Sequence, residues 1–151
     1  MKRISTLIVL VIALSLTASV MANPPDQKFV GEAKCKMCHK IQHTSWAATK
    51  HAKALDSLKP AEQKDAKCIG CHVTNNDAAM PGVQCEACHG AGGGYMTMKV
   101  MKDPAAAKAA GLNSKPDKAL CEKCHNKQSP TFKGFNFDEA VKKVHDHKPK
   151  A

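Results

Sequence analysis

A five-residue pattern, Cys-x-x-Cys-His, occurs four times in this chain and uses every cysteine in it. The 151 residues include eight cysteines, which fall into pairs separated by two residues, and each pair is followed at once by a histidine. The four copies span Cys35–His39, Cys68–His72, Cys85–His89 and Cys121–His125. No cysteine is left over, so the chemistry assigned to the pairs must also explain the repeated histidine.

The histidine decides between the uses that cysteine pairs have in proteins. A disulfide framework has no need of a histidine after each second cysteine, and a zinc site does not require one at that offset four times. A thioredoxin-like motif occurs once, in a strand–helix–strand context. Cys-x-x-Cys-His is the attachment pattern of haem c. Its thiols bond the porphyrin edge, and its imidazole binds the iron. The sequence therefore predicts four haem c groups.

This prediction gives each motif residue a role, and it names no catalytic residue. The cysteines expected to form thioether bonds are Cys35, Cys38, Cys68, Cys71, Cys85, Cys88, Cys121 and Cys124. The proximal iron ligands are His39, His72, His89 and His125. Aromatic residues make up only 4% of the chain, and a small chain with few large side chains builds a poor core. We expect the haems to supply the core and the haem-free chain to be unfolded.

The first 22 residues are typical of a secretory signal peptide. Lys2 and Arg3 precede an apolar run over residues 4–20, and a small residue, Ala22, ends the segment. We expect cleavage after Ala22, which leaves one tetrahaem domain over residues 23–151. The alternative is an uncleaved anchor, because an apolar run of about 17 residues is at the lower limit for a membrane span. Nothing after residue 22 resembles a second span.

Histidines outside the motifs are candidates for the sixth position of an iron, where a second imidazole gives a low-potential electron-transfer centre. The segment from Glu32 to Leu58 predicts a helix over most of its length. On such a helix His51 lies in an apolar stripe and points away from the first haem, so we predict it as a distal ligand of another iron. His43 lies one turn after His39. It either faces solvent or a haem propionate, or it serves a neighbouring iron.

The C-terminal segment from Phe137 to His145 predicts a short helix capped by Asp138. His145 lies on its apolar face, and we predict it as the second distal ligand, with His147 exposed. The alternative exchanges the roles of these two histidines.

Three methionines follow the third motif through a glycine-rich turn: Met96, Met98 and Met101. A methionine thioether can bind a haem iron and raises its potential. The alternative is that these side chains pack against a porphyrin face without binding the metal.

With these residues placed, the chain resembles the tetrahaem cytochrome c-554 family over nearly all of residues 31–148. The resemblance lies in strings longer than the bare motif: CKMCHKIQ from Cys35, HAKA from His51, GVQCEACHG from Gly82 and FNFDEAVKKV from Phe135. It implies a mainly α fold with extensive loops, a small multihaem cytochrome c whose core is four covalently attached haems in stacked pairs.

The resemblance also implies a ligand set. Three haems of the family have two imidazole ligands, and the haem on the second motif is five-coordinate. Two family distal histidines correspond to His51 and His145. The third stands after the third motif, where this chain has no histidine and Met98 is nearby. The first haem is therefore expected to be bound by Met98, to be open, or to be served by a shifted residue such as His43.

An electron carrier is the function that these features favour over an enzyme. Closely spaced irons let an electron hop while the protein sets spacing, ligands and burial. The formal charge is +10, and lysines around the first motif either steer an acidic redox partner or neutralise propionates. We expect redox proteins as partners, no nucleic acid, no membrane span after cleavage, and a monomer or weak dimer. The periplasm is the expected compartment, with the cell exterior as the alternative.

Two other functions fit the same motifs. A five-coordinate haem could reduce nitric oxide or a similar small molecule. Copies of the chain could also stack into an extracellular cytochrome conduit, which would need ligands shared between subunits.

Overall fold

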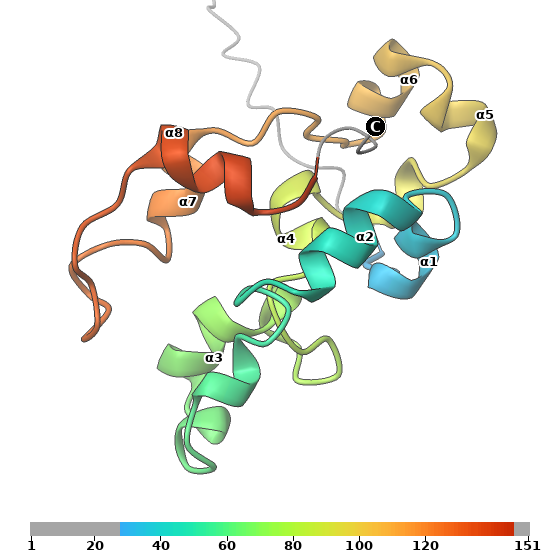
Figure 1. Cartoon of the computed structure of the whole chain (residues 1–151). Helices are drawn as coiled ribbons and strands as arrows, with labels where there is room; N and C mark the ends of the chain where they lie inside the picture. The colour runs from blue at the N-terminus through green and yellow to red at the C-terminus, as the bar shows by residue number, and fades with distance from the viewer. Residues whose placement is uncertain (1–27, 147–151) are drawn as a thin grey trace, which may run out of the picture.

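Short helices joined by long loops make up the part of the chain that the structure, a computed structural model, describes, residues 28–146 (Figure 1). The predicted signal peptide and His147 lie outside this range. The α-helices are α1 (Glu32–Lys36), α2 (Lys40–Ala47), α3 (Ala66–His72), α4 (Cys85–His89), α5 (Met98–Met101), α6 (Pro104–Ala109), α7 (Lys118–Glu122) and α8 (Phe137–Ala140). The 3₁₀-helices are η1 (Leu55–Ser57), η2 (Glu62–Lys64), η3 (Thr74–Asn76), η4 (Gly92–Gly94) and η5 (Val141–Lys143).

This content confirms the mainly helical fold class with extensive loops. Residues 28–146 contain no β-strand, and an isolated antiparallel bridge joins Val73 to Pro81. No helix in the same range has the length and apolar character needed to cross a membrane.

The continuous helix predicted from Glu32 to Leu58 is wrong. Two helices form instead, because His39 has φ −105° and ψ 49°, which interrupts the helical backbone between α1 and α2. The second helix ends at Ala47, where the Thr49 hydroxyl donates to the carbonyl of Trp46 at 2.7 Å. Such local side-chain bonds compete with the helical pattern. His51 lies in the turns that follow, so its direction cannot be taken from an ideal helix through His39.

The C-terminal helix has a different cap from the one predicted. The Asn136 side chain accepts a hydrogen bond from the Glu139 amide at 3.2 Å, so Asn136, and not Asp138, caps α8. Asp138 lies in the first turn, where an acidic residue is still favourable because of the helix dipole. The backbone continues as η5, and His145 follows it.

Few apolar side chains are buried within the polypeptide. Among residues 28–146 the buried apolar residues are Val73, Ala91, Tyr95 and Ala107. They lie beside buried polar residues, Thr74, Gln84 and Glu86, and every buried side-chain nitrogen or oxygen in this range has a hydrogen-bond partner. These residues are therefore held together largely by polar contacts.

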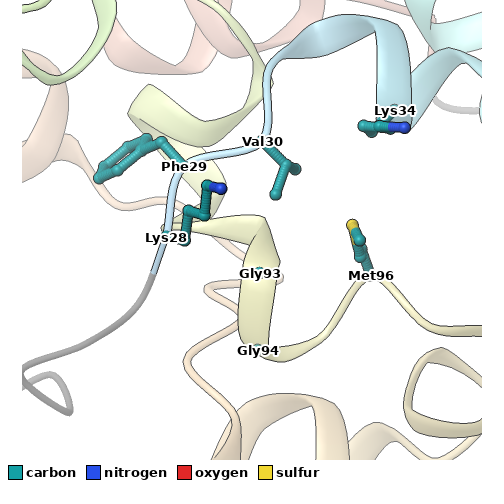
Figure 2. A pocket seen from close by; sticks show the side chains of 7 residues that line it. All are labelled: Lys28, Phe29, Val30, Lys34, Gly93, Gly94 and Met96. Carbon is teal, nitrogen blue, oxygen red and sulfur yellow. The ribbon is translucent and has the colours of Figure 1, made fainter.

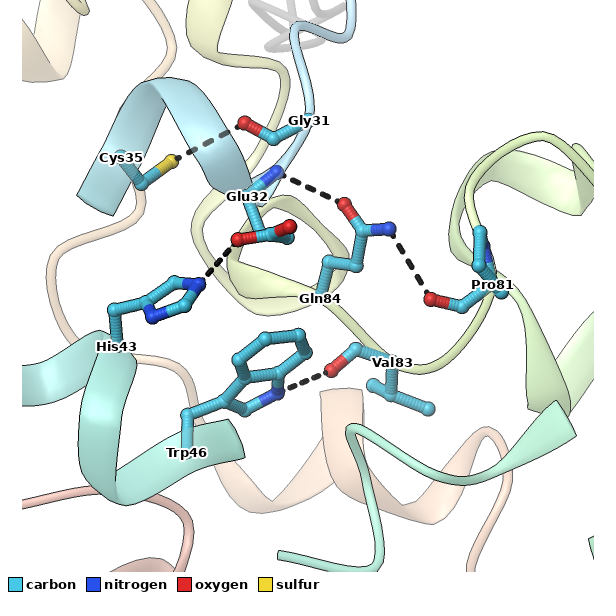
Figure 3. Close-up of polar contacts among 8 residues, drawn as sticks. All are labelled: Gly31, Glu32, Cys35, His43, Trp46, Pro81, Val83 and Gln84. Atoms are coloured by element: carbon cyan, nitrogen blue, oxygen red, sulfur yellow. Dashed lines mark hydrogen bonds and ion pairs between the residues drawn. The ribbon is translucent and has the colours of Figure 1, made fainter. Parts of the chain in front are cut away.

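The centre of the molecule joins segments that are far apart in sequence. Helices α1, α2 and α4 lie together there, and α3 lies at one end (Figure 1). The Trp46 indole donates to the Val83 carbonyl at 2.8 Å, and the Glu32 amide donates to the Gln84 side chain at 3.0 Å (Figure 3). The Asp146 amide donates to the Ser45 hydroxyl at 2.7 Å, which fixes the C-terminal segment against α2. These contacts hold the first and third motifs against each other.

Candidate haem centres

Each motif forms a helical turn that brings its two sulfurs and its imidazole together. The second and third motifs lie wholly within α3 and α4. The first and fourth start at the ends of α1 and α7, and the His39 and His125 amides donate to the carbonyls of Cys35 and Cys121, each at 2.9 Å. No disulfide joins any of the eight cysteines, so all of their sulfur atoms are available for thioether bonds. One turn places residues i, i+3 and i+4 on the same side of the backbone, the side on which a porphyrin edge and its iron would lie.

Two motif histidines are oriented as iron ligands by backbone carbonyls. The Nδ1 atom of His72 lies 2.7 Å from the Ala54 carbonyl oxygen, and that of His89 lies 2.7 Å from the Asn113 carbonyl oxygen. A carbonyl only accepts, so Nδ1 must carry the hydrogen and Nε2 must present its lone pair. This arrangement fixes the tautomer and ring direction of metal-bound histidines. The residues present therefore fit a haem iron bound through Nε2.

Cysteines of different motifs lie close enough to perturb one another in the haem-free chain. The hydrogen bond with the Cys85 thiol, and then burial, raise the pKa of Cys35. Burial, and then the charge of Cys121, raise the pKa of Cys88. Burial, and then the hydrogen bond with the Cys71 thiol, raise the pKa of Cys124 to about 12. The structure thus brings the motifs together in the order first, third, fourth, second.

His51 faces the histidine of the fourth motif. The centres of the His51 and His125 rings are 5.8 Å apart. Metal–imidazole nitrogen bonds are about 2 Å long, so two imidazoles on opposite sides of one metal ion have centres roughly 6 Å apart. Burial, and then the nearby His125, lower the pKa of His51. Its imidazole is therefore kept in the neutral form that binds metals.

His145 stands in the same relation to the third motif. The centres of the His89 and His145 rings are 6.2 Å apart. The chain from α8 and η5 delivers His145 to this place, and the bond between the Asp146 amide and Ser45 holds it there. The two histidines singled out from the sequence as distal ligands are thus the two that pair with motif histidines.

The remaining candidates for a sixth ligand are placed differently. Within residues 28–146, no second imidazole ring pairs with His39 or His72. His43 has a partner that the sequence did not suggest, because its Nε2 atom contacts the Glu32 carboxylate and its side chain is only 12% exposed. Met98, at the start of α5, is 65% exposed.

Met96 lies beside the first motif. It lines a hollow of about 510 Å³ together with Lys34, on the helix that carries Cys35, and with the segments 28–30 and 93–94 (Figure 2). Of the methionines after the third motif, Met96 therefore lies near the first motif, and it is 48% exposed.

Sequence reasoning missed Glu86, which is the most deeply buried charged residue described. It occupies the first variable position of the third motif and is 2% exposed. Its carboxylate accepts hydrogen bonds from the amides of Val30, Gly31 and Gly92. The signal available in the sequence was weak, because the fourth motif has a glutamate at the same position.

The helical fold and the paired motifs define a c-type cytochrome. A family model described as cytochrome c554 and c-prime matches residues 34–90, and a model of a doubled CXXCH motif matches residues 78–130. A curated cytochrome c-554 of Nitrosomonas europaea is 30% identical over an alignment of 193 positions, which covers 89% of this chain and 82% of the relative.

A solved structure of the reduced state of cytochrome c554 from Nitrosomonas europaea matches with a TM-score of 0.59 at 27% identity, covering 80% of this chain and 84% of that one. The chain therefore belongs to the cytochrome c-554 family. This membership gives it covalently bound haem c and a role in electron transfer.

Proposed function

We propose that this chain is a tetrahaem electron carrier that is exported to the periplasm and passes electrons between redox partner proteins. Each haem would be held by the two cysteines and the histidine of one motif. Bound haem supplies an iron that takes up and releases one electron. The observation that carries the proposal is the two pairs of neighbouring imidazoles, His51 with His125 and His89 with His145, at separations suited to one iron each.

The polypeptide orients the ligands and orders the centres. The Ala54 and Asn113 carbonyls hold the rings of His72 and His89 through Nδ1. We infer that His51 is the distal ligand at the fourth motif and His145 at the third. From the proximity of the cysteines we infer a transfer order of first, third, fourth and second haem. This order places the first and second haems at the two ends, where partners would exchange electrons.

Electron paramagnetic resonance of the oxidised protein tests the ligand assignment. We expect low-spin signals for the third and fourth haems, since imidazole on both sides of an iron gives a low-spin centre. Replacing His51 with Ala should convert the fourth haem's signal to high spin and leave the third unchanged, and His145→Ala should do the reverse. A single substitution that alters both signals, or neither, would refute the assignment.

Export to the periplasm rests on the N-terminal sequence. Lys2, Arg3 and the apolar run over residues 4–20 have the form of a signal peptide. Expression in a bacterium with a haem c maturation system, followed by cell fractionation and N-terminal sequencing, tests the proposal. A periplasmic product that starts at Asn23 supports it, and retention of the full chain in the membrane fraction contradicts it.

A second candidate function is reduction of a small molecule such as nitric oxide at the haem of the second motif. It is favoured by one observation: no imidazole ring within residues 28–146 pairs with His72. An iron without a sixth protein ligand can bind such a molecule. Nitric oxide added to the reduced protein should change the spectrum of one haem and oxidise the others. Slow or absent oxidation leaves electron carriage as the function.

A further inference from the structure

Glu86 places a buried negative charge inside the third motif. It follows Cys85 directly, and its residue is 2% exposed. The Val30 amide donates to Oε1 at 2.9 Å and to Oε2 at 3.1 Å, the Gly31 amide donates to Oε2 at 2.8 Å, and the Gly92 amide donates to Oε1 at 2.6 Å. The side chain therefore ties the segment before α1 and the turn after α4 to the third motif.

The hydrogen-bond pattern fixes the charge state of Glu86. Both oxygens accept from backbone amides, and a protonated carboxyl would turn its own hydrogen toward one of these donors. The group is therefore a carboxylate. The ion pairs found within residues 28–146 are His43 with Glu32, Lys118 with Glu122 and Lys142 with Glu139. Amide dipoles stabilise the Glu86 charge, and no cation among these pairs cancels it.

The charge of Glu86 acts on two motifs. After the hydrogen bond with Cys85, burial and the charge of Cys85, it contributes to the raised pKa of Cys35 in the first motif. In the third motif the hydrogen bond with Cys35 lowers the pKa of the Cys85 thiol, and the charge of Glu86 is among the effects that oppose this lowering. Its field therefore reaches the sulfur atoms to which the first and third haems would be bonded.

The fourth motif provides an internal comparison. Glu122 occupies the same position, directly after the first cysteine, as Glu86 does in the third motif. Its side chain is 46% exposed and lies 3.3 Å from the Lys118 ammonium group. Exposed charges are screened by water and salt, and exposed pairs have small effects. The same residue type at the same offset is thus buried and unpaired in one motif and solvated and paired in the other.

We propose that Glu86 is a positioning residue that lowers the reduction potential of the haem on the third motif and, less strongly, of the haem on the first. Adding an electron to Fe(III) removes one positive charge from the haem. A buried anion beside it stabilises the oxidised state more than the reduced state, because charges interact strongly in a low-dielectric interior. The inference rests on the proposed function, since it requires a haem on each of these motifs.

The test compares three variants of the haem-loaded protein by spectroelectrochemical titration: Glu86→Gln, Glu86→Asp and Glu122→Gln. Glu86→Gln removes the charge and keeps the size of the side chain. We expect the reduction equilibrium constant of the third haem to rise at least tenfold, a shift of about 59 mV for one electron. Glu86→Asp keeps the charge and should shift this haem less than Glu86→Gln does. Glu122→Gln, the matched control, should change every equilibrium constant less than twofold. The His145→Met substitution identifies the third haem, because it moves that titration wave.

Three results would overturn the proposal. One is a Glu86→Gln protein with all its haems and unchanged potentials. Another is a Glu86→Asp protein that shifts as far as Glu86→Gln, which would assign the effect to geometry and not to charge. The third is failure of both Glu86 variants to acquire haem, which would make the residue structural only. If Glu86→Gln alone fails to acquire haem, the Glu86→Asp protein decides. Haem potentials equal to those of the wild-type protein support the proposal, and shifted potentials overturn it. Missing haems in the wild-type protein would instead refute the proposed function.

Discussion

The third and fourth motifs have the same five-residue pattern, including a glutamate after the first cysteine, yet the fold gives them different surroundings. In the third, α4 holds the whole motif, and Glu86 is buried among backbone amides. In the fourth, α7 ends at Glu122, which lies at the surface beside Lys118. The imidazoles also differ: His89 is fixed by the Asn113 carbonyl, whereas His125 stacks on Phe135 with ring centres 4.8 Å apart.

This difference shows which properties the motif determines and which it does not. The local pattern is sufficient to place two thiols and an imidazole on one helical turn. Burial, charge and hydrogen bonding around that turn come from residues distant in sequence, and these surroundings tune the potential of a bound haem. Two centres with the same attachment pattern are therefore expected to have different potentials.

The largest expected effect is the loss of cooperative folding when the third motif cannot hold its haem. Replacing both Cys85 and Cys88 with Ala should abolish a cooperative thermal transition, because the third motif also holds the segment around Val30 and the turn at Gly92. Replacing Cys121 and Cys124 should leave a cooperative transition at lower temperature. Circular dichroism of both variants checks this. Equal losses of structure would remove the distinction between the two motifs.

The next largest effect is expected from replacing the distal ligands, because each substitution should change the reduction potential of one of the two haems. His145→Met should raise the potential of the third haem and His51→Met that of the fourth, because a thioether ligand favours Fe(II) relative to imidazole. Each substitution should move one wave in a redox titration. If His145→Met moved the wave of the fourth haem, or His51→Met that of the third, the assignment of the two distal ligands would be reversed.

A smaller effect is expected from crowding the buried glutamate. A Cβ atom at Gly92 would lie 2.9 Å from a Val30 methyl group and 3.0 Å from the Glu86 carboxylate. Gly92→Ala should therefore destabilise the haem-loaded protein by about 1–3 kcal/mol, as overpacking does in other proteins. The control is Gly70→Ala in α3, where the nearest side-chain atom would be 3.4 Å away. Thermal denaturation compares the two, and a control that loses as much stability as Gly92→Ala would show that crowding of Glu86 is not the cause.

The smallest effect is expected at the surface of the fourth motif. Lys118→Ala removes the exposed pair with Glu122, and such pairs contribute about 0.2–1 kcal/mol or less. Chemical denaturation should detect little change, and the fourth haem should keep its potential. A shift in the potential of the fourth haem as large as that expected from Glu86→Gln for the third would show that solvent exposure does not explain the difference between Glu86 and Glu122.

The attachment residues and the helical class could be predicted from the sequence because they depend on local spacing. The sequence also singled out His51 and His145 as distal ligands; their rings lie near those of His125 and His89, and the ligand role stays a prediction. The continuous helix from which the direction of His51 was predicted does not form, because His39 and Thr49 interrupt it. The apolar neighbours of His51 were the informative part of the pattern.

Two features depend on contacts that no local pattern carries, and the N-cap of α8 is a local signal that was assigned to the wrong residue. The Nε2 atom of His43 contacts the Glu32 carboxylate, a partner eleven residues earlier that the helical spacing of His39 and His43 did not suggest. Asn136 caps α8 by accepting a hydrogen bond from the Glu139 amide, two positions before Asp138, the predicted cap. Glu86 reaches amides 55 and 56 residues earlier in the chain, and only the folded structure distinguishes it from Glu122.

Intact-mass measurement of the exported protein, combined with a haemochrome assay, tests the central claim most directly. We expect a polypeptide carrying four covalently attached haems, one on each Cys-x-x-Cys-His motif, with no free thiol. A chain whose cysteines are free or paired as disulfides, or one that carries fewer than four haems after full maturation, would contradict it.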